Sequence, residues 1–464
     1  MFRYPVYWIA RSVARGAASV YFGRTIVRGS ENIPAEGPAI IAANHPQSIL
    51  DALLISISCR RTVHYLAHGG LFRNRIKRAM LRACGAIPIH RHEDAQAEEG
   101  GNLDSFAACR ALLEAGGCLG IFPEGTSLEK RRVQPLKTGT ARIAFDAEVT
   151  REFGLGVRIV PAGLSFQSRR RFRSNVLASF GRPIEANAYA ELYAEDPAAA
   201  VRQLTEKLGK DIRGLVVDVD RSELEELVTG VERIYKGEIL HDALRNFRGK
   251  DRFDREHFVS REIAAAAQYF YEHDPEGLTR VKALMEIYGT KLERLKLKDQ
   301  IVRDADQSFR DMATRLVALV ALASPIALYG ALWNALPYQL TRLLVRRLSP
   351  DGTKTHFYQL TQGAWIFLIF YAFYFYGLDT RFGPWNSLAL LSTFALSGLF
   401  CLRFVAALST GRSHLRLVYL RATHGVTIQK LVILRRNILR EMEIARRIYE
   451  RAQSSGEIAR RPTE

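Results

Sequence analysis

The chain has 464 residues, of which 48% are hydrophobic and 25% charged, a balance that excludes wholesale disorder. This length is enough for about three domains and for a full hydrophobic core without disulfides. The Lys and Arg residues number 66 against 48 Asp and Glu, a net charge of +18, so we expect a polyanionic partner: nucleic acid, an anionic membrane or a phosphorylated substrate. The five cysteines form no Cys-x-x-Cys pair, which argues against a zinc site or a disulfide scaffold.

Residues 1–28 predict an amphipathic helix at a membrane interface. Arg11 and Arg15 interrupt its apolar stretch, which argues against a cleaved signal peptide. On a helix the two arginines share one face, and apolar residues on the rest of the helix are available to lipid. Those residues are Val6, Ile9, Val13 and Val20. A packing helix of a soluble domain is the alternative.

Residues 29–217 alternate short β-like runs with amphipathic helical stretches. The strand-like runs are Ala39–Ala43, Thr62–Leu66, Gly117–Phe122, Val157–Phe166 and Val176–Phe180. The helical stretches are Ala52–Ser58, Leu71–Ala83, Leu103–Glu114 and Thr138–Val149. This alternation predicts an α/β domain, a mixed sheet covered by helices.

The rest of the chain predicts three further segments. Residues 218–311 are charged and helix-periodic, residues 312–411 form a membrane domain, and residues 412–464 form a basic amphipathic tail. Three runs in the membrane domain carry no charge, and each has about 20 residues or more, the length of a transmembrane helix. These runs are Leu316–Thr341, Phe357–Leu378 and Phe382–Leu402. Burial of all three in a soluble protein is improbable, so the sequence predicts a membrane protein.

The charges between the apolar runs predict how the chain crosses the bilayer. Arginines and lysines follow the first and third runs, whereas the loop between the second and third holds only Asp379 and Arg381. Because short basic loops stay cytoplasmic, the second and third runs form a hairpin with both ends inside. The first run contains Pro325 and Pro337, and it is expected to be bent or re-entrant and to lie in or dip into the cytosolic leaflet.

The first candidate for catalysis is the segment from Asn44 to Asp51, between an apolar strand and a helix-like run. Reactive groups of α/β enzymes occupy such strand-to-helix turns. His45 is suited to accept a proton, and the nearby Asp51 to fix its tautomer and stabilise the imidazolium. A surface histidine and a helix N-cap are the alternative interpretation.

The second candidate runs from Gly120 to Ser127, again after a strand, and is followed by basic residues up to Lys137. Glu124 beside the flexible Gly125 is suited to the hydroxyls of a polyol phosphate, and the cations to its phosphate. A solvated basic loop is the alternative.

Four blocks in order resemble the glycerolipid acyltransferase family, which includes glycerol-3-phosphate and lysophosphatidate acyltransferases. They are the Asn44–Asp51 block, Ile87-Pro88-Ile89-His90-Arg91, Phe122-Pro123-Glu124-Gly125-Thr126-Ser127 and Ile159-Val160-Pro161-Ala162-Gly163. The resemblance covers about residues 29–217. Five residues separate His45 from Asp51 where four are commonest, and Ser127 stands where Arg is usual. With a later Lys-Thr-Gly and the Phe172-Arg173-Ser174 segment, these features resemble the fungal glycerol-3-phosphate/dihydroxyacetone-phosphate acyltransferases, whose acceptor is the first expectation.

The resemblance implies a role for each matching residue. His45 would be the general base that activates an acceptor hydroxyl for attack on an acyl thioester, oriented by Asp51. The acceptor and its phosphate would contact Arg91, Glu124, Gly125, Lys137 and Arg173, and Pro161 would belong to the acyl-donor pocket. The donor would be acyl-CoA or acyl-carrier protein, and no metal or organic cofactor is implied because a thioester is already activated.

Two other functions are weighed against this one. A catalytically inactive membrane-binding or scaffold protein would be favoured if His45 or Asp51 were replaced, and both are present. Nucleic-acid binding is disfavoured by the apolar runs and the lack of a recognisable motif. We therefore expect an acyltransferase in the inner (cytoplasmic) membrane, with anionic lipids as partners and its catalytic domain on the cytosolic side.

Overall fold

The computed structural model describes residues 5–46, 49–89, 101–125, 131–167, 173–219, 221–243, 252–297, 299–303, 309–348 and 355–455. The chain divides into two compact units. Unit 1 comprises Met1–Asp220 and Lys250–His257, and unit 2 comprises Arg221–Gly249 and Phe258–Glu464. The finer division into five segments stays a prediction.

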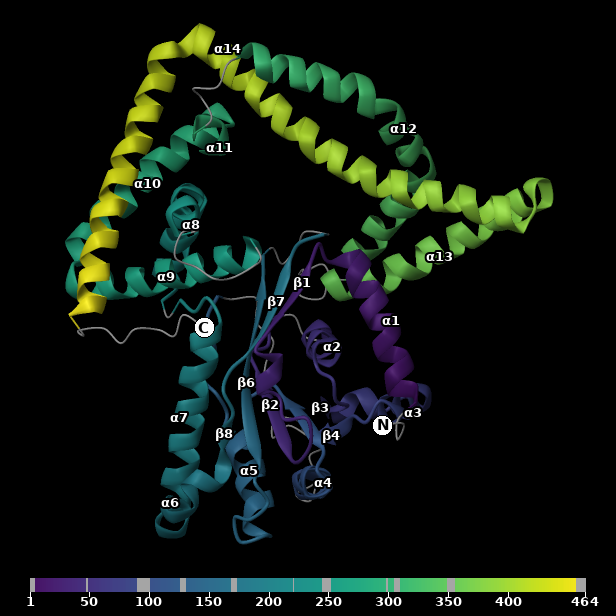
Figure 1. Ribbon diagram of the computed structural model, residues 1–464, viewed down its shortest axis with the longest axis vertical. Coiled ribbons are helices and arrows are strands. Elements are labelled where there is room, and N and C mark those ends of the chain that lie inside the picture. Colours follow the sequence, from purple (N-terminus) through teal and green to yellow (C-terminus); the bar gives the residue numbers. More distant parts are fainter. Residues whose placement is uncertain are drawn as a thin grey trace. The chain divides into compact units, whose positions relative to one another are not determined.

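Unit 1 is built on one eight-stranded sheet in the order β1-β7-β6-β2-β5-β3-β4, with β8 also paired to β6 (Figure 1). The strands are β1 (Thr25–Arg28), β2 (Ala39–Ala43), β3 (Val63–His68), β4 (Ile87–Ile89), β5 (Cys118–Ile121), β6 (Arg158–Phe166), β7 (Val176–Phe180) and β8 (Ile184–Glu185). β6 pairs antiparallel with β7 and β8, and the other pairings are parallel. The predicted mixed α/β sheet is confirmed, including all five strand-like runs.

Four helices of unit 1 follow the predicted stretches between residues 52 and 149 with shifted starts, the first helix lies within the predicted residues 1–28, and the last two had no predicted stretch. They are α1 (Pro5–Tyr21), α2 (Ile49–Ser58), α3 (Arg75–Ala83), α4 (Gly101–Glu114), α5 (Gly139–Val149), α6 (Ala190–Glu195) and α7 (Pro197–Leu215). α2 begins three residues before the predicted Ala52, so Asp51 lies in its first turn. α3 begins at Arg75 because Gly69–Phe72 form a separate 3-10 turn.

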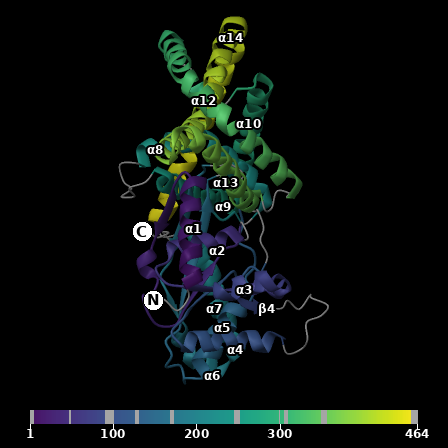
Figure 2. The ribbon, with the colours of Figure 1, turned by 90° about the vertical axis from the view of Figure 1, so that its right-hand side faces the viewer.

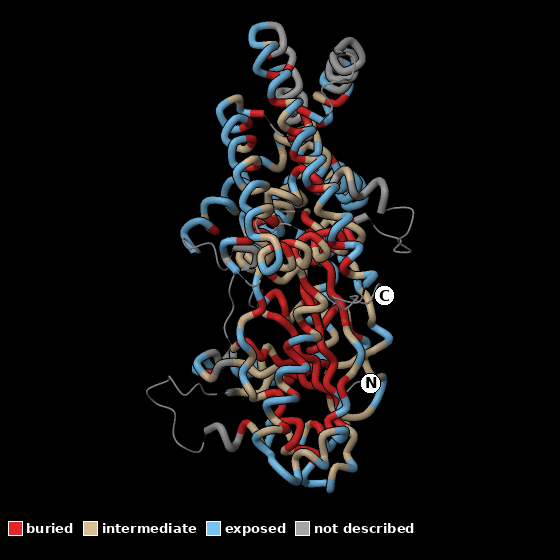
Figure 3. The backbone as a smooth tube through the Cα atoms, turned by 90° about the vertical axis from the view of Figure 1, so that its left-hand side faces the viewer, coloured by how far each residue is buried: buried red, intermediate tan, exposed pale blue. Residues whose placement is uncertain are grey.

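The centre of the sheet is fully buried, and this explains the uninterrupted apolar run of β2. All five β2 residues are 0% exposed, as expected for a strand covered on both faces. Alternate strand residues such as Ile40 and Leu119 pack in one apolar cluster with α4, α5 and α7. α2 covers the other face, with α1 beside it (Figure 2). Figure 3 shows the buried backbone concentrated along these strands.

The described part of unit 2 is helical. Its elements are α8 (Ser222–Ala243), most of α9 (Arg252–His273), α10 (Pro275–Leu295), α11 (Asp299–Arg303), α12 (Phe309–Leu348), α13 (Thr355–Phe382) and α14 (Pro384–Ser454). Among the described residues, three stretches are long and apolar enough to cross a membrane: Val320–Leu348, Tyr358–Phe382 and Pro384–Ser409. The three predicted apolar runs are therefore helical, and their exposed apolar side chains indicate a membrane association.

The three apolar helices pack on one another through a small polar cluster. Asn334 of α12 donates to the Phe394 carbonyl of α14 at 2.9 Å and accepts from the Tyr371 hydroxyl of α13 at 2.9 Å. A Cβ on Gly330 would lie 2.1 Å from the carbonyl oxygen of Ser397, so only glycine permits this approach of α12 to α14. α12 stays helical through both prolines yet is bent, as Figure 1 shows, which agrees with the expected bend.

A buried ion pair joins the end of the chain to the helices that precede the apolar block. α14 breaks at His424, which has non-helical dihedral angles, and the helix changes direction there. Beyond the break, Arg435 donates to Asp299 of α11 at 2.9 Å and to Glu238 of α8 at 3.1 Å. Arg435 and Asp299 are 7% and 5% exposed, so this buried pair links two parts of unit 2 that lie 136 residues apart in the sequence.

Candidate active site

The turn from β2 to α2 carries His45 and is fixed by its neighbour Asn44. The Asn44 amide donates to the Leu164 carbonyl of β6 at 3.1 Å, and its oxygen accepts from the Leu164 N–H at 2.7 Å. This two-way contact replaces a sheet hydrogen-bond pair just beyond β2, whose last residue, Ala43, is in register with Ala162. His45 therefore leaves the sheet in a defined direction.

His45 and Asp51 lie within hydrogen-bond distance. The imidazole Nδ1 lies 3.0 Å from Oδ2 of Asp51. The Asp51 side chain is 0% exposed, whereas that of His45 is 19% exposed. When Nδ1–H donates to the carboxylate, Nε2 keeps its lone pair, which is the arrangement a general base needs. Starting α2 at Ile49 places Asp51 opposite His45 despite the longer spacing.

The imidazole of His45 also has an aromatic neighbour. The Phe122 ring stacks on it with centroids 4.0 Å apart and an interplanar angle of 15°. Phe122 directly follows β5, the strand beside β2. The parallel pairing of β2 and β5 brings their carboxyl ends together, and with them two of the four sequence blocks.

Glu124 contacts the same turn through its carboxylate. Oε1 accepts the main-chain N–H of His45 at 2.8 Å, and Oε2 accepts that of Gln134 at 3.0 Å. Burial raises the pKa of Glu124, while these two N–H groups lower it by stabilising the carboxylate. Because Glu124 is only 7% exposed, its carboxylate is stabilised by these main-chain N–H groups in place of water.

Gly125 and Lys137 lie together next to Glu124. Gly125 has a positive φ of 69°, and a Cβ there would lie 2.9 Å from Cε of Lys137. The main-chain N–H of Lys137 donates to the Pro123 carbonyl at 2.8 Å, which fixes the start of this side chain. Lys137 is exposed, so its ammonium is available to a ligand at this edge.

Of the three remaining predicted site residues, one lies outside the described residues, one lies at the His45 end of the sheet and one contacts α1. Arg91 lies outside the described residues. Pro161 is buried in β6, in register with Ala42, at the same end of the sheet as His45. Arg173 donates to the carbonyls of Ser19 and Val20 at 3.2 and 3.1 Å, so its guanidinium binds the last turn of α1 rather than the His45 turn.

Asn44 and Phe122 had no predicted role, although both stand in the quoted motifs. Their neighbours are Leu164 and His45, 120 and 77 positions away in the chain, and no sequence pattern indicates either contact. Among the described residues, no three His, Cys, Asp or Glu side chains gather in a possible metal site. The expectation of catalysis without a metal stays a prediction.

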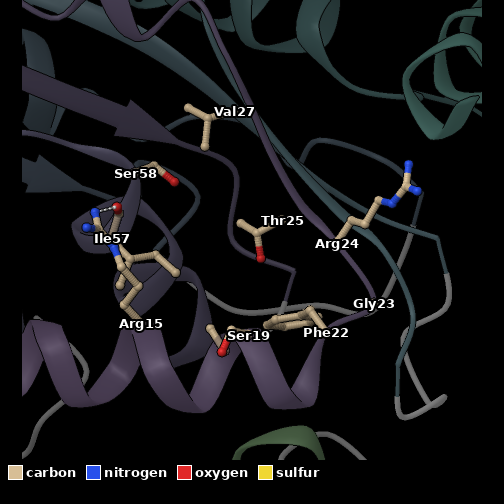
Figure 4. A pocket seen from close by; sticks show the side chains of 10 residues that line it. Arg15, Ser19, Phe22, Gly23, Arg24, Thr25, Val27, Ile57 and Ser58 are labelled. Atoms are coloured by element: carbon tan, nitrogen blue, oxygen red, sulfur yellow. Dashed lines mark hydrogen bonds between the residues drawn. The ribbon is translucent and has the colours of Figure 1, made fainter. Parts of the chain in front are cut away.

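A cavity of about 460 Å³ lies at the other end of α2. α1, β1 and the last residues of α2 line it, and Arg15 crosses to the Ile57 carbonyl at 2.8 Å (Figure 4). Helix carbonyl ends, which carry partial negative charge, border this space. It belongs to the contact between α1 and α2, at the end of α2 opposite the His45 turn.

Comparison with known proteins finds similar acyltransferases. Residues 24–165 match the family model for an acyltransferase domain. Glycerol-3-phosphate O-acyltransferase 2 of Saccharomyces cerevisiae is 24% identical over 56% of this chain and 34% of its own length. An uncharacterized acyltransferase of Schizosaccharomyces pombe is 23% identical over 71% of this chain and 60% of its own length. The 1-acyl-sn-glycerol-3-phosphate acyltransferase of Bacillus subtilis is 26% identical over 45% of this chain and 92% of its own length.

The mixed sheet and the His45 turn thus belong to an acyltransferase domain. Through this domain the chain is similar to glycerol-3-phosphate and 1-acyl-sn-glycerol-3-phosphate acyltransferases. It spans less than two thirds of the length of either yeast relative.

Proposed function

We propose that this chain transfers a fatty acyl group from an acyl thioester to a hydroxyl of glycerol-3-phosphate or a lysophospholipid. The observation that carries the proposal is the His45–Asp51 pair, 3.0 Å apart with Asp51 fully buried, inside a domain of this family. The names of the relatives cover both glycerol-3-phosphate and 1-acylglycerol-3-phosphate as acceptors. Glycerol-3-phosphate is the acceptor we put first.

The reaction uses His45 as a proton carrier. Nε2 removes the proton of the acceptor hydroxyl as its oxygen attacks the thioester carbonyl, while the buried Asp51 stabilises the imidazolium. The tetrahedral intermediate then expels the thiolate, which takes the proton from Nε2. An ester forms, the thioester C–S bond breaks, and His45 returns to its starting state.

The acceptor phosphate requires cations close to His45. Lys137 is exposed beside Gly125 and is one such cation, and Arg91 is assigned the same task on the strength of the motif. Pro161, buried at the same end of the sheet, is assigned to the donor side. Arg173 is bound to α1, and we leave it out of the phosphate site.

The reaction takes place at a membrane. Three long apolar helices in unit 2 and the exposed valines and isoleucine of α1 support this location. We assign the catalytic domain to the cytosolic side of the inner membrane. The net charge of +18 favours an anionic surface.

An inactive scaffold is the competing function, and one assay separates the two. Purified protein in vesicles is given a radiolabelled donor, acyl-CoA or acyl-carrier protein, and in parallel reactions glycerol-3-phosphate, dihydroxyacetone phosphate, lysophosphatidate or lysophosphatidylcholine. We expect acyl transfer to the phosphomonoester acceptors, with glycerol-3-phosphate the best. If no acceptor is acylated with either acyl-CoA or acyl-carrier protein as donor, the chain is not this enzyme.

A further inference from the structure

The carboxylate of Glu124 is already engaged on both sides. Its two oxygens accept main-chain N–H groups from His45 at 2.8 Å and from Gln134 at 3.0 Å. Turning this carboxylate toward a substrate would leave both N–H groups without their acceptor. An unsatisfied buried polar group is costly, so the observed orientation is strongly preferred.

Phe122, two residues earlier, holds the imidazole of the same histidine. Its ring stacks on His45 with centroids 4.0 Å apart and is nearly parallel to the Tyr65 ring, with centroids 6.2 Å apart and an interplanar angle of 9°. The Tyr65 hydroxyl donates to the Ala52 carbonyl of α2 at 2.9 Å. The Tyr65 hydrogen bond therefore connects these rings to α2, the helix that carries Asp51.

We propose that Glu124 and Phe122 are positioning residues for His45, and that Glu124 is not a ligand of the acceptor. This inference rests on the proposed function. Glu124 fixes the main chain of His45, Asp51 fixes Nδ1, and Phe122 fixes the plane of the ring. Together they hold Nε2 at the place where the acceptor hydroxyl must arrive.

The two roles of Glu124 differ in their kinetic consequences. A ligand of the acceptor contributes to binding, so its loss raises the KM for the acceptor. A residue that holds the base acts on the chemical step, because a displacement of about 1 Å costs on the order of 100-fold in rate. Its loss lowers kcat and leaves both KM values nearly unchanged.

The Glu124→Gln variant distinguishes the two roles. The amide has the size of the carboxylate, but it has only one oxygen, so its N–H₂ group faces one of the two main-chain N–H donors and cannot accept from it. We expect kcat to fall about 10- to 100-fold, with acceptor and donor KM within about threefold of the wild type. A tenfold or larger rise in the acceptor KM at near-normal kcat would assign Glu124 to substrate binding and overturn the inference.

Glu148→Gln is the matched control. Glu148 is 0% exposed, and its two oxygens likewise accept main-chain N–H groups, from Leu155 and Val157, but it lies in α5 away from the His45 turn. We expect Glu148→Gln to lower the melting temperature as Glu124→Gln does and to leave kcat of the folded fraction unchanged. An equal loss of kcat in both variants would mean that Glu124 acts through stability alone.

Phe122→Leu tests the proposed role of Phe122 in holding the imidazole of His45. It also tests the inference if Glu124→Gln fails to fold. Leucine fills the space but offers no flat face to the imidazole. We expect kcat to fall about 10-fold with both KM values retained, and an unchanged kcat would remove Phe122 from this role. If the wild type acylates no acceptor, the proposed function falls and this inference with it; a selective rise in acceptor KM defeats the inference alone.

Discussion

Asp51 is a carboxylate with no solvent contact in the first turn of α2, and its Oδ2 lies 3.0 Å from the imidazole Nδ1 of His45. Burying a carboxylate is costly unless hydrogen bonds and an opposite charge compensate. During the proposed reaction the positive charge appears on His45, 3.0 Å away, and the cost of burial is then partly recovered. Asp51 therefore stabilises the transition state, in which His45 is positively charged, more than it stabilises the resting enzyme.

Replacing Asp51 by Asn tests this pairing. The amide N–H₂ favours the tautomer in which Nδ1 accepts and Nε2 carries the proton, so the base is blocked. We expect kcat to fall about 100- to 10,000-fold while the thermal unfolding of the purified protein stays close to the wild type. Activity above half of the wild-type value would show that Asp51 does not orient the base.

At this scale the motif spacing predicted the His45–Asp51 pair but not its surroundings. The pair is six positions apart and forms within one turn, so local pattern was enough. Asn44 and Glu124 contact residues 120 and 79 positions away, which only the sheet order brings near. Arg173 was predicted near the phosphate from sequence blocks, and the structure places its guanidinium at the carbonyl end of α1.

Among the elements, α1 shows how an amphipathic helix can divide its faces. Its inward arginines bind the carbonyl end of α2: Arg11 donates to Ser56 at 2.7 Å and Arg15 to Ile57 at 2.8 Å. Its outward residues Ile9 and Val13 are 66% and 68% exposed. The 3.6-residue period predicted which face is apolar, but the carbonyls that receive the arginines have no signature in the sequence.

A double variant, Arg11→Met with Arg15→Met, measures this contact. Methionine keeps most of the apolar stem but removes the cations from a helix end whose carbonyls attract them. We expect the free energy of unfolding of unit 1 to fall by about 1–3 kcal/mol in denaturant titrations of the purified protein. Arg60→Met, at an exposed arginine next to the same helix end, removes one charge and is the control, so losses are compared per charge removed. An equal loss in the control would show that net charge, not these hydrogen bonds, stabilises α2.

For the whole molecule, the buried contact of Arg435 with Asp299 restricts the membrane topology. Asp299 precedes the three apolar helices and Arg435 follows them, so in the membrane arrangement that we propose both lie on one side of the bilayer. The chain between them must therefore cross an even number of times. Two crossings by α13 and the start of α14, with the bent α12 on the cytosolic side, satisfy this condition and agree with the basic loops.

Cysteine labelling in intact cells tests the two-crossing arrangement, with the wild type as background for its native cysteines. We expect a cysteine at Thr380, between α13 and α14, to react with an impermeant reagent from outside. A cysteine at Ser349, between α12 and α13, should react only after the cells are permeabilised. Labelling of Ser349→Cys in intact cells would contradict this topology.

The sequence predicted the character of each large region but not how the regions fold together. Composition alone separates an α/β part from a charged helical part and an apolar block, because each has its own hydrophobic period. The return of α14 to α8 and α11 could not be predicted, since it depends on one break at His424 and on partners 136 or more positions away.

The central claim is that His45 is the base of an acyl transfer, and the most direct test is the rate of that transfer with His45 replaced by Ala. Wild type and variant are purified in parallel, shown to unfold at the same temperature, and assayed in vesicles with acyl-CoA and saturating glycerol-3-phosphate. We expect the wild type to form acylglycerol phosphate and His45→Ala to be slower by about 100- to 10,000-fold. A folded His45→Ala variant that transfers acyl groups at the wild-type rate would contradict it.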